Sequence, residues 1–260
     1  MNVTHLTSLK NPRVQAFRSL KERKGRLAEG AFLVEGDKMV SEALASGFPV
    51  RTLVLREDHA LPDALPEDLP VCVLPEHVFA SLTDTRTPQG IAAVIGFPEG
   101  AVGGALPPEN APARLIVLDG VQDPGNVGTI LRTADAAGLD GAVLGPDCAD
   151  VFSPKTLRAT MGSVFRVPLF FPADLPAALR ALRDRGYAVL SSQLDGAPFY
   201  ERGDVGEKWA LIIGNEGNGV SPAVRAEATH RLRLPMRGGA ESLNAAIAAG
   251  IMMYDLTRTR

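Results

Sequence analysis

The sequence has few of the residues that build metal sites and disulfide frameworks. It contains two cysteines and four histidines in 260 residues, and none of them falls in a CxxC or HExxH spacing. Cys72 and Cys148 are most simply small buried residues, and each histidine is most simply structural or exposed. We therefore expect no disulfide framework, no zinc site and no metal-dependent chemistry.

Long apolar runs are also missing. The first ten residues, MNVTHLTSLK, contain no apolar segment of the kind found in secretory signals, and no stretch approaches the ~18 residues of a membrane span. The apolar fraction of 45% and the charged fraction of 22% are those of an ordinary globular protein, and the length suits two modest domains. We expect a cytoplasmic protein that does not associate with membranes.

An excess of positive charge is missing as well. The net charge of −3 argues against a protein that coats nucleic acid through bulk charge. Residues 10–26 nevertheless hold many basic side chains beside the single acid Glu22. The basic members are Lys10, Arg13, Arg18, Lys21, Arg23, Lys24 and Arg26. This run is either a solvated helix face or a phosphate-binding patch, and charge alone does not decide between them.

The first part of the chain has the pattern of a small α/β domain. Apolar runs predict strands at residues 31–36, 51–55, 71–74 and 91–95, and periodic patterns predict helices at 12–24, 37–45 and 75–82. Asp37 is the expected cap of the second helix. Residues 98–112 are rich in Pro and Gly, so we expect a domain at residues 1–97 followed by a linker at 98–112.

Residues 113–260 have the pattern of a second α/β domain, in which strands and helices alternate. Strands are predicted at 114–118, 141–144, 166–169, 187–191, 209–213 and 231–234, and helices at 126–137, 154–161, 173–185, after Ser221, and at 242–258. This alternation predicts a mostly parallel sheet with helices on both faces.

Glycine motifs that hold phosphates are missing from this domain. The chain has neither GxGxxG nor GxxxxGK[ST], so neither dinucleotide-fold nor P-loop binding is the default expectation. Three other segments instead place polar residues directly after predicted strands, which is where open α/β sheets bind ligands. In the first, residues 118–132, Asn126 is the expected helix cap. Arg132 follows among apolar residues, where a charge needs a partner or a cavity, and a plain salt bridge would explain it.

The second and third segments follow later strands. Residues 209–221 contain Gly214 and Glu216, with Ser221 as the cap of a helix, although such a loop is by itself only a turn. Residues 232–244 lead into the last helix, for which Ser242 is the expected cap. The residues expected to form its buried stripe are Leu243, Ile247, Gly250, Ile251 and Tyr254. The alanines between them allow close packing on a sheet or on a symmetry-related partner.

Taken together, these segments resemble the three ordered motifs of the SpoU (TrmH-like) RNA 2′-O-ribose methyltransferases of the SPOUT superfamily. The matching patterns are Asn126-x-Gly128-x-x-x-Arg132, Gly214-Asn-Glu216-Gly-x-Gly-x-Ser221, and Leu234-Pro-Met236 followed by Ser242-Leu243-Asn244. The resemblance extends to Leu9–Arg13, Thr87–Ile91 and Met161–Pro168, and so covers nearly the whole chain.

The resemblance implies a fold and a cofactor. The second domain would be an α/β fold with a deep trefoil knot formed by the loops around Gly214 and Met236, an exception to the usual topology rules. S-adenosylmethionine would bind in those loops, at Gly214, Leu234, Met236 and Leu243. Such apolar and backbone contacts suit a flat adenine ring.

The resemblance also implies a catalytic set. Methyl transfer to a ribose hydroxyl needs alignment and activation of the oxygen rather than a metal. The family gives the central role to the motif-one arginine, here Arg132, which stays protonated and so is a poor base. We expect it to bind the adjacent phosphate and to stabilise the developing alkoxide. Asn126, Glu216, Ser242 and Asn244 would position the ribose and Arg132.

The first domain, by the same resemblance, is a small ribosomal-protein-like RNA-binding domain, which favours the phosphate-patch interpretation of Arg13, Arg18, Arg23 and Lys24. The family works as homodimers through the last helix, so Arg132 could serve the site of the partner. We expect ribosomal RNA as substrate, because tRNA-specific relatives usually lack such a domain. The alternatives are a tRNA methyltransferase, a non-catalytic RNA-binding or ribosome-assembly protein, and a small-molecule methyltransferase, which would leave the first domain unexplained.

Overall fold

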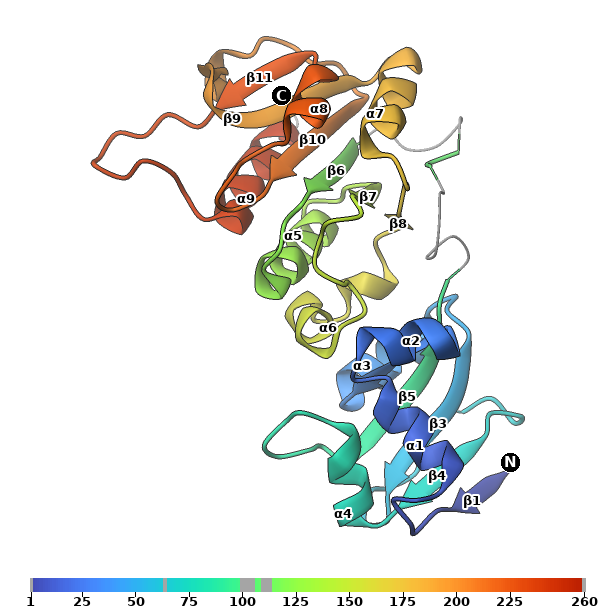
Figure 1. The fold of residues 1–260 in the computed structure, drawn as a ribbon. Coiled ribbons are helices and arrows are strands. Elements are labelled where there is room, and N and C mark those ends of the chain that lie inside the picture. The colour runs from blue at the N-terminus through green and yellow to red at the C-terminus, as the bar shows by residue number, and fades with distance from the viewer. Residues whose placement is uncertain (1, 63–64, 99–105, 109–113, 259–260) are drawn as a thin grey trace. The chain divides into compact units, whose positions relative to one another are not determined.

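The computed structural model describes residues 2–62, 65–98, 106–108 and 114–258, and the chain forms two compact units. The first unit comprises Met1–Pro98 and Phe152–Phe165, and the second comprises Glu99–Val151 and Arg166–Arg260 (Figure 1). Most of the linker predicted at 98–112 lies outside the described residues. Sequence patterns placed 152–165 in the second domain, whereas the structure groups this segment with the first unit.

The first unit contains a five-stranded mixed sheet in the order β1-β4-β3-β5-β2. Its elements are β1 (Val3–His5), α1 (Pro12–Ser19), α2 (Arg23–Glu29), β2 (Ala31–Glu35), α3 (Asp37–Ala45), β3 (Val50–Arg56), β4 (Val71–Leu74), α4 (Glu76–Phe79), the 3-10 turn Ala80–Leu82, β5 (Ile91–Gly96), α6 (Pro154–Thr160) and the 3-10 turn Ser163–Phe165. Strands β1, β4 and β3 are parallel, and β5 runs antiparallel to both β3 and β2.

Side chains on the two faces of this sheet bury different partners. On one face, β-strand residues such as Val54 and Leu74 pack with Val14 and Phe17 of α1. Aromatic rings gather around Phe32, whose ring stacks on that of Phe152 at a centroid distance of 4.7 Å. Offset aromatic contacts of this kind add to the apolar burial. The aromatic contact explains why segment Phe152–Phe165 belongs to this unit.

The first unit contains a strand that was not predicted, β1, and its helices differ from the sequence prediction at several positions. The helix expected over residues 12–24 is two helices, α1 and α2, because the backbone at Glu22 is extended. Asp37 is the first residue of α3 and not its cap, since Gly36 occupies the cap position with φ +98°. Such a positive φ is accessible to glycine at little cost.

The second unit contains a six-stranded, wholly parallel sheet in the order β11-β9-β10-β6-β7-β8. Its elements are β6 (Arg114–Asp119), α5 (Pro124–Ala136), β7 (Gly141–Leu144), β8 (Leu169–Phe170), α7 (Leu175–Asp184), β9 (Ala188–Pro198), the 3-10 turn Phe199–Glu201, β10 (Trp209–Gly214), α8 (Pro222–Ala226), β11 (His230–Arg233) and α9 (Ala245–Leu256). The predicted parallel α/β sheet is confirmed, but β9 continues well past residue 191.

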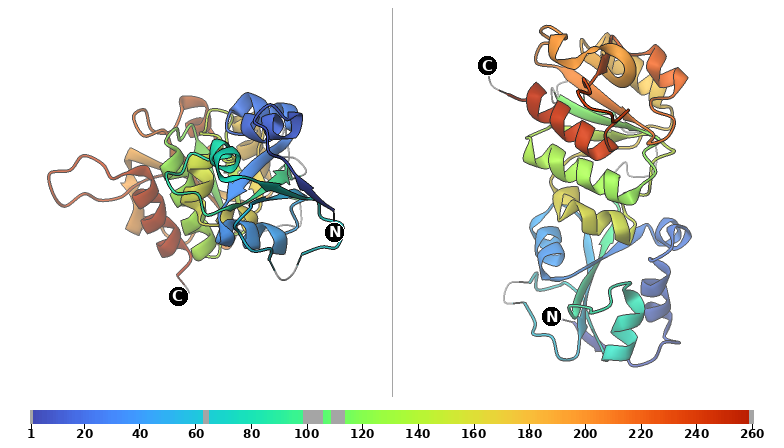
Figure 2. Two further views of the ribbon diagram at one scale, coloured as in Figure 1. Left: turned by 90° about the horizontal axis from the view of Figure 1, so that it is seen from below. Right: turned by 90° about the vertical axis from the view of Figure 1, so that its left-hand side faces the viewer.

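Helices cover both faces of the parallel sheet. Leu115 and Val117 of β6 pack with Leu179 of α7 and Val224 of α8. Because neighbouring side chains of a strand point to opposite faces, Ile116 and Leu118 point to the other face. Helices α5 and α9 pack against each other there, side by side in both figures (Figures 1 and 2). None of the described helices is long and apolar enough to cross a membrane.

The last helix, α9, buries a different face from the predicted one. Its buried residues are Ala246, Ala249, Met252 and Met253. Ile247 and Tyr254 of the predicted stripe are 56% and 52% exposed, and Leu243 and Ile251 are exposed as well. The alanines allow α9 to approach α5 closely, and this packing leaves the larger apolar side chains on the opposite, exposed face. The helix cap is Asn244 and not Ser242.

Candidate functional site

Three segments of the second unit meet at the carboxyl ends of its parallel strands. They are the turn between β6 and α5, the loop after β10, and the loop between β11 and α9. Strands β6 and β10 are paired in register from Trp209↔Arg114 to Gly214↔Asp119, so the first two segments leave the sheet side by side. The three polar segments predicted from the sequence are therefore brought together at one edge.

The loop after β10 is a tight turn that glycine makes possible. A Cβ atom at Gly214 would lie 2.2 Å from the backbone nitrogen of Val220, so no other residue fits. Asn215 closes the turn, since its Oδ1 accepts hydrogen bonds of 3.0 Å from the backbone nitrogens of Gly217 and Asn218. Its Nδ2 donates to the backbone oxygen of Gly120 at 2.9 Å, which connects this loop to the β6–α5 turn.

Glu216 makes the second connection between these loops. Its carboxylate accepts hydrogen bonds from the backbone nitrogens of Gln122 and Asp123, both at 3.1 Å, and from Asn126 Nδ2 at 2.9 Å. Burial raises the pKa of Glu216, but the hydrogen bonds from Asn126 and the backbone outweigh it, so the pKa is lowered. Glu216 is therefore an ionised acceptor that holds the turn, not a group suited to carry a proton at neutral pH.

Asn126 has a different role from the predicted one. The cap of α5 is Asp123, whose Oδ1 accepts a hydrogen bond of 2.9 Å from the backbone nitrogen of Asn126. With the cap supplied by Asp123, the side chain of Asn126 bridges the other two segments. Its Nδ2 donates to Glu216, and its Oδ1 accepts a hydrogen bond of 2.9 Å from Asn244 Nδ2.

Asn244 completes this network and also begins the last helix. Its Oδ1 accepts hydrogen bonds from the backbone nitrogens of Ala246 and Ile247 at 2.9 and 3.3 Å. The chain of side chains Glu216–Asn126–Asn244, which we call the three-loop network, thus joins all three segments. The predicted site residues include its three members but not Asn215, Asp123 or Asp119, which accepts a hydrogen bond from the backbone nitrogen of Ser221. Each of these three residues lies at the end of a buried strand or shortly after it, and this position is the sequence signal that could have identified them.

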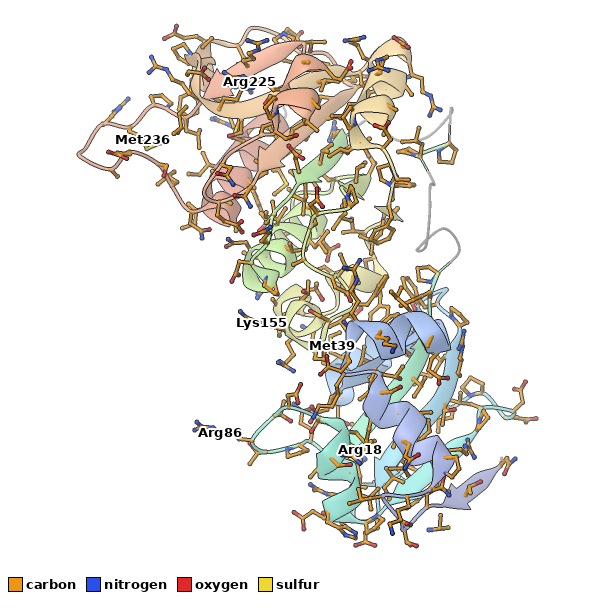
Figure 3. All side chains as sticks on the ribbon, viewed as in Figure 1. Arg18, Met39, Arg86, Lys155, Arg225 and Met236 are labelled. Carbon is orange, nitrogen blue, oxygen red and sulfur yellow. The ribbon has the colours of Figure 1, made fainter. Side chains whose placement is uncertain are left out.

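A hollow of about 690 Å³ lies beside the three-loop network, within the size range of small-molecule sites. All four predicted cofactor residues line it, namely Gly214, Leu234, Met236 and Leu243, together with Glu216, Ser242 and Asn244. Figure 3 shows Met236 on the loop that projects between β11 and α9. Apolar side chains beside exposed peptide groups suit a flat heteroaromatic ring, so the lining fits the predicted cofactor.

One wall of the hollow was not predicted from the sequence. It is formed by residues 192–195, which belong to the part of β9 beyond the predicted strand end. Arg225 of α8 forms an ion pair with Asp195 at this wall. The apolar run that predicted β9 ends at Leu190, whereas the strand continues through polar residues because β11 pairs with it across a register shift.

Arg132 is not the buried charge that its neighbours suggested. Ile130, Leu131 and Ala134 point into the core, whereas Arg132 lies on the exposed face of α5. The helical repeat places position 132 on the side opposite 130 and 134. Within the described ranges, no hydrogen bond or ion pair reaches its guanidinium group. The three-loop network therefore does not include Arg132, and Ser242 lines the hollow without capping α9.

The predicted RNA-binding residues lie in the first unit. Arg13 and Arg18 are exposed on α1, and Arg23 and Lys24 are exposed on α2. Other basic residues of the run have structural partners. Lys21 Nζ lies 2.6 Å from a carboxylate oxygen of Asp84. Arg26 is only 3% exposed and donates to the backbone oxygens of Leu20 and Lys21.

The structure also places the potential metal ligands and the two thiols of the described residues. No group of three or more His, Cys, Asp or Glu side chains in those ranges is placed to hold a metal ion. Both cysteines are unpaired, and Cys72 is buried. Burial raises the pKa of Cys148 to about 11, and its Sγ donates to the backbone oxygen of Leu118. The Cys148 thiol therefore stays protonated at neutral pH.

Comparison with known proteins gives consistent results along the chain. Residues 113–254 match the SpoU rRNA Methylase family, and residues 11–93 match the MRM3-like substrate binding domain. The chain is 39% identical over 251 residues to the 23S rRNA (guanosine(2553)-2′-O)-methyltransferase RlmP of Bacillus subtilis (strain 168). The aligned residues cover 96% of this chain and 98% of that protein.

Two solved structures are similar to this chain over nearly its whole length. The AdoMet-bound rRNA methyltransferase from Sinorhizobium meliloti has a TM-score of 0.86 and 33% identity, covering 98% of this chain and 97% of that one. The SpoU methyltransferase AviRb from Streptomyces viridochromogenes, in complex with AdoMet, has a TM-score of 0.85 and 27% identity, covering 95% and 97%.

Proposed function

Because the chain belongs to the SpoU rRNA methylase family, we propose that the hollow beside the three-loop network is the site where this RNA 2′-O-ribose methyltransferase works. The enzyme uses S-adenosylmethionine and acts on RNA, with ribosomal RNA favoured by the relatives. The observation that carries the assignment is the three-loop network, which joins all three family motifs along one side of the hollow.

The residues of the hollow have distinct roles in this proposal. Leu234, Met236 and Leu243 would hold the adenosine part of the cofactor, with the backbone at Gly214. Bound S-adenosylmethionine supplies an electrophilic methyl group. Asn126 and Asn244, fixed by Glu216, would hold the loops and the ribose so that the 2′-oxygen is aligned for displacement. Ser242 offers a hydroxyl at the edge of the same hollow.

Arg132 is proposed as the residue that stabilises charge. Its guanidinium stays protonated, so it binds the phosphate next to the target ribose and stabilises negative charge developing on the 2′-oxygen. Its exposure and its lack of a partner in the described residues leave its donors available to RNA. Bidentate donation to a phosphate is a geometry that arginine provides and lysine does not.

A second copy of the chain is proposed to cover α9. Ile247, Ile251 and Tyr254 expose an apolar face, and such faces mark protein interfaces. Helix α5, which carries Arg132, packs beside α9, so Arg132 of one subunit could serve the site of the other. Ile247→Asp should convert a dimer into a monomer in light scattering. An unchanged mass would contradict this interface.

Three further parts of the proposal rest on the resemblance. We propose that the loops around Gly214 and Met236 form a trefoil knot, consistent with the position of β9 between β11 and β10. The first unit would bind RNA, with Arg13, Arg18, Arg23 and Lys24 as contacts, since it matches a substrate binding domain. Ribosomal RNA as substrate implies a cytoplasmic location.

The decisive experiment on the proposed function is Arg132→Ala, with Arg132→Lys as its matched variant. Arg132→Ala should bind S-adenosylmethionine as the unmodified enzyme does in calorimetry, because Arg132 does not line the hollow. Methylation of an unmodified 23S rRNA transcript should fall by roughly 10²–10³-fold, as expected for loss of a group that stabilises developing charge. Arg132→Lys should restore only part of the rate. Unchanged turnover in Arg132→Ala would overturn the assignment.

A further inference from the structure

The loop at residues 83–90 of the first unit is held at both ends. At its start, Lys21 Nζ donates to the backbone oxygen of Thr83 at 3.3 Å and lies 2.6 Å from Asp84. Further along, the Glu35 carboxylate accepts hydrogen bonds from Thr85 Oγ1 at 2.9 Å and from the backbone nitrogen of Gln89 at 3.2 Å. The tip of the loop is therefore fixed although it projects from the unit.

The same loop is joined to the first turn of α3. Gln89 Oε1 accepts a hydrogen bond of 3.1 Å from the backbone nitrogen of Asp37. A Cβ atom at Gly36 would lie 2.6 Å from that oxygen, so glycine at position 36 allows this close approach. The loop and the start of α3 are consequently in direct contact. They expose Arg86 at the tip of the loop and Lys38 on the helix.

Helix α6, from the segment that joins this unit, adds a third cation. Arg158 is exposed and lines a small cleft together with Thr83 and Asp84 of the loop. In Figure 3, Arg86 and the α6 residue Lys155 point to the same side of the unit. The loop, the start of α3 and α6 thus present basic side chains on neighbouring parts of one surface.

Acidic residues near these cations already have partners. Asp37 Oδ1 lies 3.3 Å from His59 Nε2, Asp84 pairs with Lys21, and Glu35 binds the loop. Among the described residues, no acidic side chain pairs with Lys38, Arg86 or Arg158. Cations that are only solvated do not need a loop that is held in place by hydrogen bonds, as the loop at residues 83–90 is. Exposed cations without acidic partners on adjoining segments are suited to a polyanion with regularly spaced phosphates.

We propose that Lys38, Arg86 and Arg158 form a phosphate-binding surface for the RNA substrate, which we call the Arg86 surface. It rests on the proposed function and uses side chains other than the predicted contacts Arg13, Arg18, Arg23 and Lys24. The chemistry recognised is the RNA backbone, because the side chains are cationic and the cleft that Arg158 lines has a volume of only about 30 Å³. Glu35 is the positioning residue that keeps the loop in place.

The first test removes two charges from the Arg86 surface in the full chain. Arg86→Ala/Arg158→Ala should weaken binding of an unmodified 23S rRNA transcript about fivefold or more, and the salt slope should fall by roughly one per lost contact. The control, Arg114→Ala/Lys208→Ala, removes two exposed charges beside the amino-terminal ends of β6 and β10 and should leave both quantities unchanged. Equal effects of the two variants, or no effect of the first, would overturn the proposal.

The second test removes the charge of Glu35, a change for which simple electrostatics and loss of the loop contacts predict opposite effects on RNA binding. Glu35→Ala removes a negative charge, so simple electrostatics predicts tighter RNA binding. Loss of the bonds to Thr85 and Gln89 should instead weaken binding a few-fold, with unchanged binding of S-adenosylmethionine as evidence of an intact second unit. Tighter or unchanged RNA binding would contradict the role of Glu35. An unmodified enzyme that neither binds nor methylates RNA would overturn the proposed function, and the Arg86 surface with it. A methylating enzyme with unaffected variants would overturn the surface alone.

Discussion

Glu216 in the second unit and Glu35 in the first do the same physical work in two different settings. Each carboxylate accepts hydrogen bonds from a segment that is far away in the sequence. Glu216 and Gln122 are 94 residues apart, and Glu35 and Gln89 are 54 residues apart. An ionised carboxylate accepts but does not donate, so it suits the amide nitrogens of a turn. The similarity shows that a glutamate in a family motif can act by fixing a loop.

The difference between the two glutamates lies in what they hold. The second unit has a wholly parallel sheet, so the loops after β6 and β10 leave the same edge and Glu216 holds them beside the hollow. The first unit has a mixed sheet, and the loop that Glu35 holds presents Arg86 instead of lining a large hollow. We expect changes at Glu216 to affect the chemical step and changes at Glu35 to affect RNA binding.

We expect the strongest loss of activity in Glu216→Gln. The amide cannot accept hydrogen bonds at both of its terminal atoms, so the turn at Gln122 and Asp123 should shift. A small misplacement of the aligned groups can lower kcat about 100-fold. Single-turnover methylation at saturating RNA would measure the loss.

Glu227→Gln is the matched control for that variant. Glu227 is buried in the same unit and pairs with Arg180 and Arg183, but it does not line the hollow. It should alter stability and leave kcat unchanged. The comparison would fail if Glu216→Gln kept its kcat, or if Glu35→Ala lowered kcat as strongly as Glu216→Gln.

Most strand positions, the parallel sheet of the second unit and the grouping of the motifs could be predicted from the sequence, because buried parallel strands are uninterrupted apolar runs. The roles of single side chains could not. Asn126 and Ser242 both have cap-forming side chains, yet Asp123 and Asn244 are the caps. The choice depends on which neighbour the other side chains contact in the folded chain. Glu35 was missed for the same reason, since its partners lie in a distant loop.

The exposed face of α9 was wrongly predicted for a related reason. Ile247 and Tyr254 have helical spacing with other large apolar residues, which ordinarily indicates the buried side. Here the neighbour is another helix at close range, and Ala246 and Ala249 fit against it better. A pattern of hydrophobicity identifies an apolar face but not whether the same chain or a second copy covers it.

We expect a smaller loss of activity from substitutions at Asn244. They can separate its bond to Asn126 from its role as the cap of α9. Asn244→Asp keeps an oxygen for the backbone nitrogens of Ala246 and Ile247 but loses the donor to Asn126. Asn244→Ala loses both. We expect both variants to lose activity, about tenfold or more, because alignment suffers in each. Only Asn244→Ala should lower the free energy of unfolding, by ~1 kcal/mol for a lost helix cap.

Thermal unfolding and methylation rates of the two Asn244 variants would measure these effects side by side. Full activity in Asn244→Asp would show that the cap alone matters and that the three-loop network extends no further than Asn126. That result would make the second unit resemble the first, with one glutamate holding one loop.

The weakest effect that we expect is a pH dependence of the stability that Glu216 contributes. It tests whether Glu216 holds its turn as an ionised carboxylate. Because folding lowers the pKa of Glu216 below its ordinary value of 4.5, its contribution to stability is present above that value. The contribution is lost as the pH falls through the lower pKa of the folded state. The difference in melting temperature between the unmodified protein and Glu216→Gln should therefore be largest near neutral pH and shrink below pH 4.5. A difference that stays constant from neutral pH into that range would mean that hydrogen-bond geometry, and not charge, fixes the turn.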